Sequence, residues 1–130
     1  MAERAIHKIL IIDDNASCRE VVATALRLSR HRVICAGSSR EAIQLLENSS
    51  PDLILLDLAL PEMSGLELLR TVRQMPQWRD LPVILFTGSG DIMHLTQGLG
   101  VSECLIKSDF SADALRSAVA RALGRRSAAA

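Results

Sequence analysis

The chain has 130 residues, 48% of them hydrophobic, and its 15 lysines and arginines balance 15 aspartates and glutamates. This length suits one compact domain with a single core, and the balanced charge argues against a surface built mainly to bind nucleic acid or an anionic membrane. Two phenylalanines and one tryptophan are the whole aromatic content, so the core must be aliphatic.

The three cysteines, Cys18, Cys35 and Cys104, lie far apart in the sequence. Their odd number and the lack of a CxxC spacing favour reduced thiols over a disulfide framework or a zinc site. The first residues lack the apolar stretch of a signal peptide, and the longest apolar runs are far too short to cross a bilayer. These features predict a cytoplasmic protein that does not enter a membrane.

Short aliphatic runs alternate along the chain with segments in which apolar residues recur at helical spacing. The runs are typical of strands buried on both faces, and the segments between them are typical of amphipathic helices. In chain order we predict strand 8–13, helix 16–30, strand 32–37, helix 40–48, strand 53–58, helix 64–75, strand 81–88, helix 91–100, strand 103–108 and helix 112–124.

Serine and glycine mark several helix ends. Ser38 or Ser39 is expected to cap the second helix, and Ser111 the last one. Gly124 is expected to end that last helix and to leave 125–130 as a flexible tail. The fourth helix is expected to be short, because glycines lie at its end.

Five strands that alternate with five helices through short loops predict an α/β fold. The sheet is expected to be parallel and doubly wound, with helices on both of its faces. We see no repeat, no low-complexity linker and no second domain, so residues 1–124 are predicted to form one domain.

Reactive polar side chains follow four of the five predicted strands. Ligands bind outside the carboxyl ends of the strands in open parallel sheets, so these side chains are expected to share one edge. They are Asp13 and Asp14 after the first strand, Asp57 after the third, Thr87 after the fourth and Lys107 after the fifth.

Three carboxylates and one ammonium group cannot share a small site comfortably, because like charges raise one another's pKa. A hard divalent cation would neutralise the excess, and Mg²⁺ suits a few carboxylates together with a phosphate oxygen. An acidic pair, a lone carboxylate, a hydroxyl and a lysine are suited to moving a phosphoryl group onto an aspartate.

The motifs "IIDDN", "LILLDLALPEMSGLELLR", "PVILFTG" and "CLIK" occur in this order with suitable separations. In this arrangement the chain resembles the receiver domain of two-component response regulators, over residues 6–123. The resemblance implies a flavodoxin-like (βα)5 fold with strand order 2-1-3-4-5. It also implies a phosphorylation switch rather than a turnover enzyme.

The resemblance implies a role for each residue at the predicted edge. Asp14 would bind Mg²⁺ directly and Asp13 partly through water, and Asp57 and the backbone carbonyl of Ala59 would complete the metal site. Asp57 would also be the phosphoacceptor.

Two further residues match the part of the family's site that contacts the phosphoryl group. Thr87 would turn its hydroxyl toward a phosphoryl oxygen, and Lys107 would bond another. The donor would be a phosphohistidine of a histidine kinase or of a histidine phosphotransfer protein. The output would pass to an unknown partner protein rather than to nucleic acid, and a homodimer through the fourth-helix to fifth-helix face is possible.

Two positions depart from the family's pattern. Cys104 stands where an aromatic residue usually reports phosphorylation, so a relay through a buried aromatic side chain is not expected here. Ser108 stands where a proline usually follows the lysine in a cis peptide. A cis Lys107–Ser108 bond would cost about 3–4 kcal/mol, so we predict that this bond is trans.

Three alternatives use the same residues differently. In a pseudo-receiver, Asp57 would be a structural carboxylate paired with Lys107, and the domain would be a protein-binding scaffold that is not phosphorylated. A flavin-type mononucleotide site would need a glycine-rich phosphate loop where "DDNAS" stands. A haloacid-type phosphatase would carry its nucleophile on the first strand in an Asp-x-Asp arrangement, whereas Asp13 and Asp14 are adjacent.

Overall fold

The computed structural model describes residues 6–58, 64–88 and 94–129, with the side chains described up to Gly124. Five strands form one parallel sheet in the order β2-β1-β3-β4-β5, which confirms the predicted doubly wound topology. The strands are β1 (Lys8–Ile12), β2 (Arg32–Ala36), β3 (Leu53–Leu56), β4 (Val83–Thr87) and β5 (Val101–Ile106).

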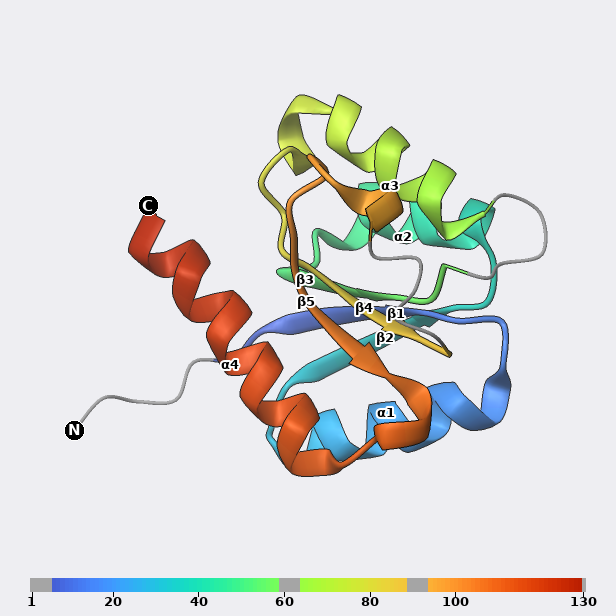
Figure 1. The fold of residues 1–130 in the computed structure, drawn as a ribbon, viewed down its shortest axis with the longest axis vertical. Coiled ribbons are helices and arrows are strands. Elements are labelled where there is room, and N and C mark those ends of the chain that lie inside the picture. The colour runs from blue at the N-terminus through green and yellow to red at the C-terminus, as the bar shows by residue number, and fades with distance from the viewer. Residues whose placement is uncertain (1–5, 59–63, 89–93, 130) are drawn as a thin grey trace.

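Four α-helices lie on the two faces of the sheet within the described ranges. They are α1 (Ala16–Leu28), α2 (Ser39–Ser49), α3 (Gly65–Gln74) and α4 (Ala112–Ala129), with short 3₁₀ turns η1 (Pro76–Trp78) and η3 (Lys107–Asp109). Helices α1 and α4 cover one face and helices α2 and α3 cover the other (Figure 1). No helix in the described part of the chain is long and apolar enough to cross a membrane.

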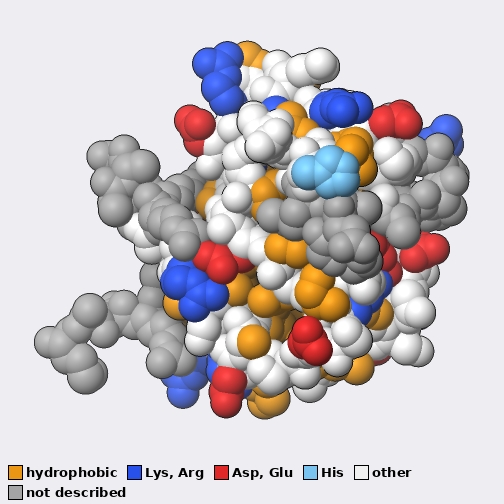
Figure 2. Space-filling view, in the orientation of Figure 1, with side chains coloured by type: hydrophobic (Ala, Val, Ile, Leu, Met, Phe, Trp, Pro, Cys, Tyr) orange, Lys and Arg blue, Asp and Glu red, His pale blue; other side chains and the backbone are white. Residues whose placement is uncertain are grey.

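The core consists of two aliphatic layers, one on each face of the sheet. Alternate residues of β1 point to opposite layers, with Ile9 and Ile11 packed toward α1 and α4, and Leu10 and Ile12 packed toward α2 and α3. All four residues of β3 are buried, as expected for a central strand that is covered on both sides. On the face shown in Figure 2, acidic and basic side chains are interspersed, in keeping with the balanced charge.

Side-chain caps explain where the helices begin. Ser38, rather than Ser39, caps α2 by accepting a hydrogen bond from the Glu41 N–H, and Ser111 caps α4 by accepting one from the Ala114 N–H. Asn15 caps α1 in the same way. Each cap satisfies an N–H group that the first helical turn leaves without an acceptor.

Two helix predictions are wrong. The region 91–100 does not form an α-helix in its described part, where residues 94–96 have 3₁₀ geometry, and residues 91–93 lie outside the described ranges. Gly98 and Gly100 adopt positive φ angles of +80° and +69°, which interrupt a right-handed helix.

The second error concerns the predicted helix end at Gly124, because α4 continues to Ala129. A glycine inside a helix costs about 1 kcal/mol relative to alanine, and flanking alanines and arginines are strong helix formers that tolerate this cost. Position 107 also differs from the prediction, because Lys107 opens the η3 turn just after β5 instead of ending the strand.

Candidate functional site

The pairing of β1 with β3 brings the first two acidic positions together. Ile12 is paired with Leu56 in the parallel register, so the next residues, Asp13 and Asp57, leave the sheet side by side. The Asp57 N–H donates to the Ile12 carbonyl at 2.9 Å. The ladder therefore continues to the point at which the carboxylates emerge.

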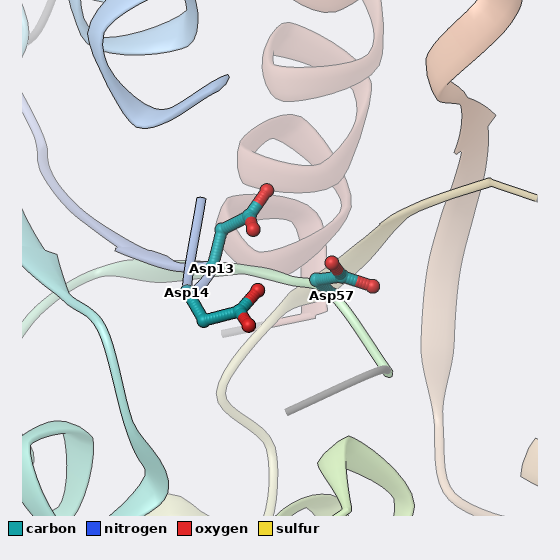
Figure 3. Close-up of side chains that lie close together, drawn as sticks. All are labelled: Asp13, Asp14 and Asp57. Atoms are coloured by element: carbon teal, nitrogen blue, oxygen red, sulfur yellow. The ribbon is translucent and has the colours of Figure 1, made fainter. Parts of the chain in front are cut away.

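Asp13, Asp14 and Asp57 form a carboxylate cluster at this edge of the sheet. Each offers a carboxylate oxygen, and these oxygens lie within 4.8 Å of one another. Asp13 and Asp57 are only 2% and 6% exposed, whereas Asp14 is exposed. Figure 3 shows Asp13 and Asp14 next to each other at the end of β1, with Asp57 beside them.

Lys107 bridges the two buried carboxylates from the far side of β4. Its Nζ donates to Asp13 Oδ2 at 2.8 Å and to Asp57 Oδ2 at 2.9 Å. Burial alone would lower the pKa of Lys107, but the hydrogen bonds to these carboxylates raise it well above its usual value. The lysine therefore stays charged at any physiological pH.

Asp13 is held at all three of its oxygen atoms. Lys107 bonds Oδ2, the Asn15 N–H donates to Oδ1 at 2.9 Å, and Arg19 Nη1 donates to the backbone carbonyl at 2.6 Å. Burial would raise the pKa of Asp13, but the bonds from Lys107 and Asn15 outweigh burial and lower it. Asp13 is therefore a preorganised anion.

Sequence reasoning missed two residues beside Asp13. Arg19 lies in the first turn of α1, and only the local fold shows that its guanidinium folds back onto the Asp13 carbonyl. Cys18 lies one residue earlier. Burial, and then a hydrogen bond with the Asp13 carboxylate, raise the pKa of its thiol to about 11. A cysteine three residues after an N-cap carries no sequence signal for such a contact.

Gly65 allows α3 to begin against the backbone that follows β3. A Cβ at this position would lie 2.5 Å from the Asp57 carbonyl oxygen and 2.5 Å from Leu58 Cα. The Gly65 N–H donates to the Leu58 carbonyl at 2.8 Å, and Ser64 caps the helix. The chain can return this close to Asp57 only because residue 65 has no side chain.

Thr87 lies at the end of β4 on the same edge of the sheet and is 4% exposed. Thr87 lies two residues after Leu85, which packs toward α2 and α3, whereas Asp57 lies two residues after Leu55, which packs toward α1 and α4. By this alternation Thr87 leaves its strand toward the other face. Four of the predicted site residues therefore lie together, namely Asp13, Asp14, Asp57 and Lys107. Thr87 lies at the end of the neighbouring strand.

The two departures from the family's pattern are visible in the structure. Cys104 is partly buried against the core layer of α2 and α3, and burial raises the pKa of its thiol. The Lys107–Ser108 peptide is trans, as predicted. All three cysteines are free thiols. Ala59, the remaining predicted metal ligand, lies outside the described residues.

The strand order and this edge define a doubly wound α/β domain whose acidic cluster is bridged by a lysine. Residues 9–120 match the sequence model of the response regulator receiver domain, and the chain belongs to that family.

Two curated relatives are transcriptional regulators. The chain is 39% identical over 93 residues to the phosphate regulon transcriptional regulatory protein PhoB of Pseudomonas aeruginosa, which is 72% of this chain and 41% of that protein. It is 35% identical over 121 residues to the regulatory protein AtoC of Escherichia coli K12, which is 92% of this chain and 26% of that protein. The chain thus spans less than half the length of either relative.

Solved structures agree with this assignment. A putative response regulator of Chloroflexus aurantiacus has a TM-score of 0.85 at 31% identity, with 92% of this chain and 99% of that chain covered. The chemotaxis protein CheY4 of Vibrio cholerae has a TM-score of 0.83 at 28% identity, with 91% and 99% covered.

Proposed function

We propose that this receiver domain is a phosphorylation switch in which Asp57 accepts a phosphoryl group from a phosphohistidine. The donor would belong to a histidine kinase or to a histidine phosphotransfer protein. The observation that carries the proposal is the bond between Lys107 and Asp57, made within a cluster of three carboxylates. A phosphoacceptor needs this combination of a nucleophilic oxygen and a fixed cation nearby.

The transfer is a displacement at phosphorus. A carboxylate oxygen of Asp57 attacks the phosphorus atom, and the new P–O bond forms as the P–N bond to the donor imidazole breaks. The imidazole nitrogen keeps the electron pair of the broken bond and is protonated by solvent, and Asp57 becomes a mixed anhydride. Before the transfer, Lys107 is bonded to Asp57 Oδ2. After the transfer, its ammonium group would bond a phosphoryl oxygen.

The donor set of the cluster fits Mg²⁺. Carboxylate oxygens that can approach within 4.8 Å of one another are ligands that a hard divalent cation prefers. Asp13, Asp14 and Asp57 would hold the ion, together with the backbone carbonyl of Ala59. When bound, Mg²⁺ supplies positive charge that neutralises the phosphoryl oxygens.

Phosphorylation changes the local charge, and that change supplies the signal. The modified side chain would gain about one further negative charge and three acceptor oxygens, and the Thr87 hydroxyl would turn toward them from the other face of the sheet. A loop with two arrangements needs a bias of only a few kcal/mol to act as a switch. The domain would work in the cytoplasm as a switch rather than as a turnover enzyme, and a partner protein would read its output.

The test is phosphorylation by a small donor. The protein and its Asp57→Asn variant are incubated with acetyl phosphate and Mg²⁺, and their intact masses are measured. A single phosphoryl adduct on the wild type and none on the variant supports the switch. If neither protein gains an adduct and neither binds Mg²⁺, the domain is a receiver-like scaffold instead.

A further inference from the structure

The two phenylalanines of the chain, Phe86 and Phe110, lie on the α1 and α4 side of the sheet. Phe86 belongs to the core layer on that side, and Phe110 packs against the layer. In the pairing of β3 with β4, Leu56 is the partner of Leu85, so the next residues along the two strands, Asp57 and Phe86, are neighbours. Partners in a parallel register point to the same face, so the Phe86 ring lies on the face from which Asp57 emerges.

The Lys107 side chain passes over Phe86 to reach the carboxylates. Lys107 follows β5, whereas Asp57 follows β3, and β4 lies between these two strands. Lys107 Nζ lies 5.8 Å from the centroid of the Phe86 ring while it bonds Asp57 Oδ2. This distance is within the range of a cation–π contact, and the ring is only 5% exposed. Phe86 therefore helps to fix the position of the ammonium group.

Phe110 contacts Phe86 with its ring edge. The ring centroids lie 5.8 Å apart and the ring planes are inclined by 65°, which is a favourable arrangement for two aromatic rings. The backbone also joins Phe110 to the lysine, because the Phe110 N–H donates to the Lys107 carbonyl at 3.3 Å and closes η3. Phe110 is thus linked to Lys107 both through the Phe86 ring and through the backbone.

Phe110 lies directly before the start of α4. The next residue, Ser111, caps this helix by accepting from the Ala114 N–H at 3.0 Å, and Ala112 packs against the same core layer as Phe110. A displacement of the Phe110 ring would therefore reach the first turn of α4. The Asp113 side chain in that turn is 88% exposed, so a partner protein could contact it.

The position at which receiver domains usually carry a reporting aromatic residue lies on the other side of the sheet. Cys104 packs against the layer of α2 and α3 and offers no ring. Thr87 leaves β4 toward that same side. A signal carried by an aromatic ring would therefore leave the site through Lys107, which contacts Phe86, and not through position 104.

We propose that Phe86 is a positioning residue for Lys107, and that Phe86 and Phe110 form an aromatic relay from Lys107 to the first turn of α4. The relay rests on the phosphorylation switch proposed above. When Asp57 is phosphorylated, Lys107 Nζ exchanges a carboxylate oxygen for a phosphoryl oxygen and moves relative to the Phe86 ring. The Phe110 ring follows Phe86, and a partner protein reads the altered first turn of α4.

The test is fluorine NMR, because two phenylalanines give two signals. The full chain is labelled with 4-fluorophenylalanine and incubated with acetyl phosphate and Mg²⁺, and the intact mass is measured on the same sample. Both fluorine signals should shift as the phosphoryl adduct forms. Asp57→Asn should gain no adduct and show neither shift.

Two variants establish the order of the contacts. In Phe86→Leu the adduct should form, but the remaining signal, from Phe110, should stay in place. A direct effect of the phosphoryl charge on Phe110 would persist in this variant, so loss of the shift identifies the ring contact. In Phe110→Leu the Phe86 signal should still shift, but phosphorylation should no longer shift the Ala112 and Asp113 amides in ¹H–¹⁵N spectra. Phe110→Tyr keeps a ring at this partly exposed position and should restore those amide shifts.

Cys104→Ala is the matched control and should show every shift of the wild type. The ¹H–¹⁵N spectrum of each variant establishes that it is folded, and if Phe86→Leu does not fold, the comparison of Phe110→Leu with Phe110→Tyr decides.

Three results would overturn the relay while the switch stands. They are a phosphorylated wild type whose Phe110 signal does not move, an equal movement of that signal in folded Phe86→Leu, and a loss of the shifts in Cys104→Ala. If the wild type gains no adduct, the proposed switch itself fails and the relay fails with it.

Discussion

A single ammonium group bridges two buried carboxylates at the edge of this sheet. Lys107 Nζ lies within 2.9 Å of an oxygen of both Asp13 and Asp57. Removing one partner from a buried ion pair is costly, because the remaining charge stays desolvated. The Lys107 side chain is 27% exposed, so it contributes less to the free energy of unfolding than a fully buried partner would.

The first prediction concerns Lys107 and pH. Lys107→Met should lower the free energy of unfolding by about 1–3 kcal/mol at pH 7 in metal-free buffer. The lowered pKa of Asp13 stabilises the fold above the unfolded value of about 3.9, and this contribution is lost as pH falls through the folded pKa. The raised pKa of Lys107 stabilises the fold below its unfolded value of about 10.4 and ceases to do so as pH rises through the folded pKa.

The difference in the free energy of unfolding between wild type and Lys107→Met should therefore be largest between about pH 5 and 9 and should shrink at pH 3. Urea unfolding followed by far-ultraviolet circular dichroism measures it. Asp113→Asn, which removes an exposed pair, is the control and should change stability by less than about 0.5 kcal/mol. A Lys107→Met protein as stable as wild type at pH 7 would contradict the argument.

At the scale of elements, the joint between β3 and α3 determines where Asp57 lies. Ser64 caps the helix, and Gly65 lets its first turn approach the Asp57 carbonyl. The approach is to backbone atoms rather than to a flexible side chain, so an added methyl group cannot be accommodated by a change of rotamer. Strain at this joint would be transmitted directly to Asp57.

The second prediction follows from that approach. Gly65→Ala should destabilise the fold by about 2–3 kcal/mol, because the new Cβ forces α3 away from β3. Gly88→Ala is the matched control, since a Cβ there would meet nothing within 4 Å, and it should change stability by less than about 0.5 kcal/mol. Equal urea midpoints for the two variants would show that α3 moves freely at this joint.

Local patterns predicted most elements, and the exceptions have physical causes. Aliphatic runs predict strands, and caps such as Ser111 predict where helices begin. Polar residues at strand ends predict the site, because parallel pairing then brings Asp13 beside Asp57. The connection from β4 to β5 had no such signal. It is held partly by Arg73, whose Nε donates to the Leu99 carbonyl at 2.6 Å and whose Nη2 donates to the Gly100 carbonyl at 3.2 Å.

The residues that support the site also lacked a local sequence signal. The bond from Arg19 to the Asp13 carbonyl depends on a side-chain rotamer, which residue spacing does not reveal. A cavity beside His7 depends on how the end of α1 packs against α4. Contacts set by the packing of whole helices were therefore beyond prediction, whereas contacts set by strand register were not.

At the scale of the molecule, one face of the sheet links the carboxylate cluster to the cavity. Helix α1 begins beside Asp13 and ends at the cavity. Helix α4 follows the turn that carries Lys107 and lines the cavity farther along. A ligand that binds only the folded state stabilises the whole domain, so the stability of the domain is a readout of binding at the cluster.

The third prediction uses that readout for metal binding. Three carboxylates and one ammonium group leave two negative charges in the cluster, so a divalent cation that binds only the folded state should stabilise it. At a Mg²⁺ concentration ten times its dissociation constant the gain is about 1.4 kcal/mol, or about 5 °C in Tm for a domain of this size. Thermal unfolding with and without Mg²⁺, at constant ionic strength, measures the shift.

Two variants identify where that ion binds. Asp14→Asn should abolish the Tm shift, because it removes the exposed member of the cluster without disturbing the Lys107 bridge. Asp113→Asn removes an exposed carboxylate from the first turn of α4, outside the cluster, and should retain the full shift, which excludes a general salt effect. A shift that survives in Asp14→Asn would place the ion elsewhere, and the phosphoryl transfer proposed for Asp57 would then have to proceed without a metal in this cluster.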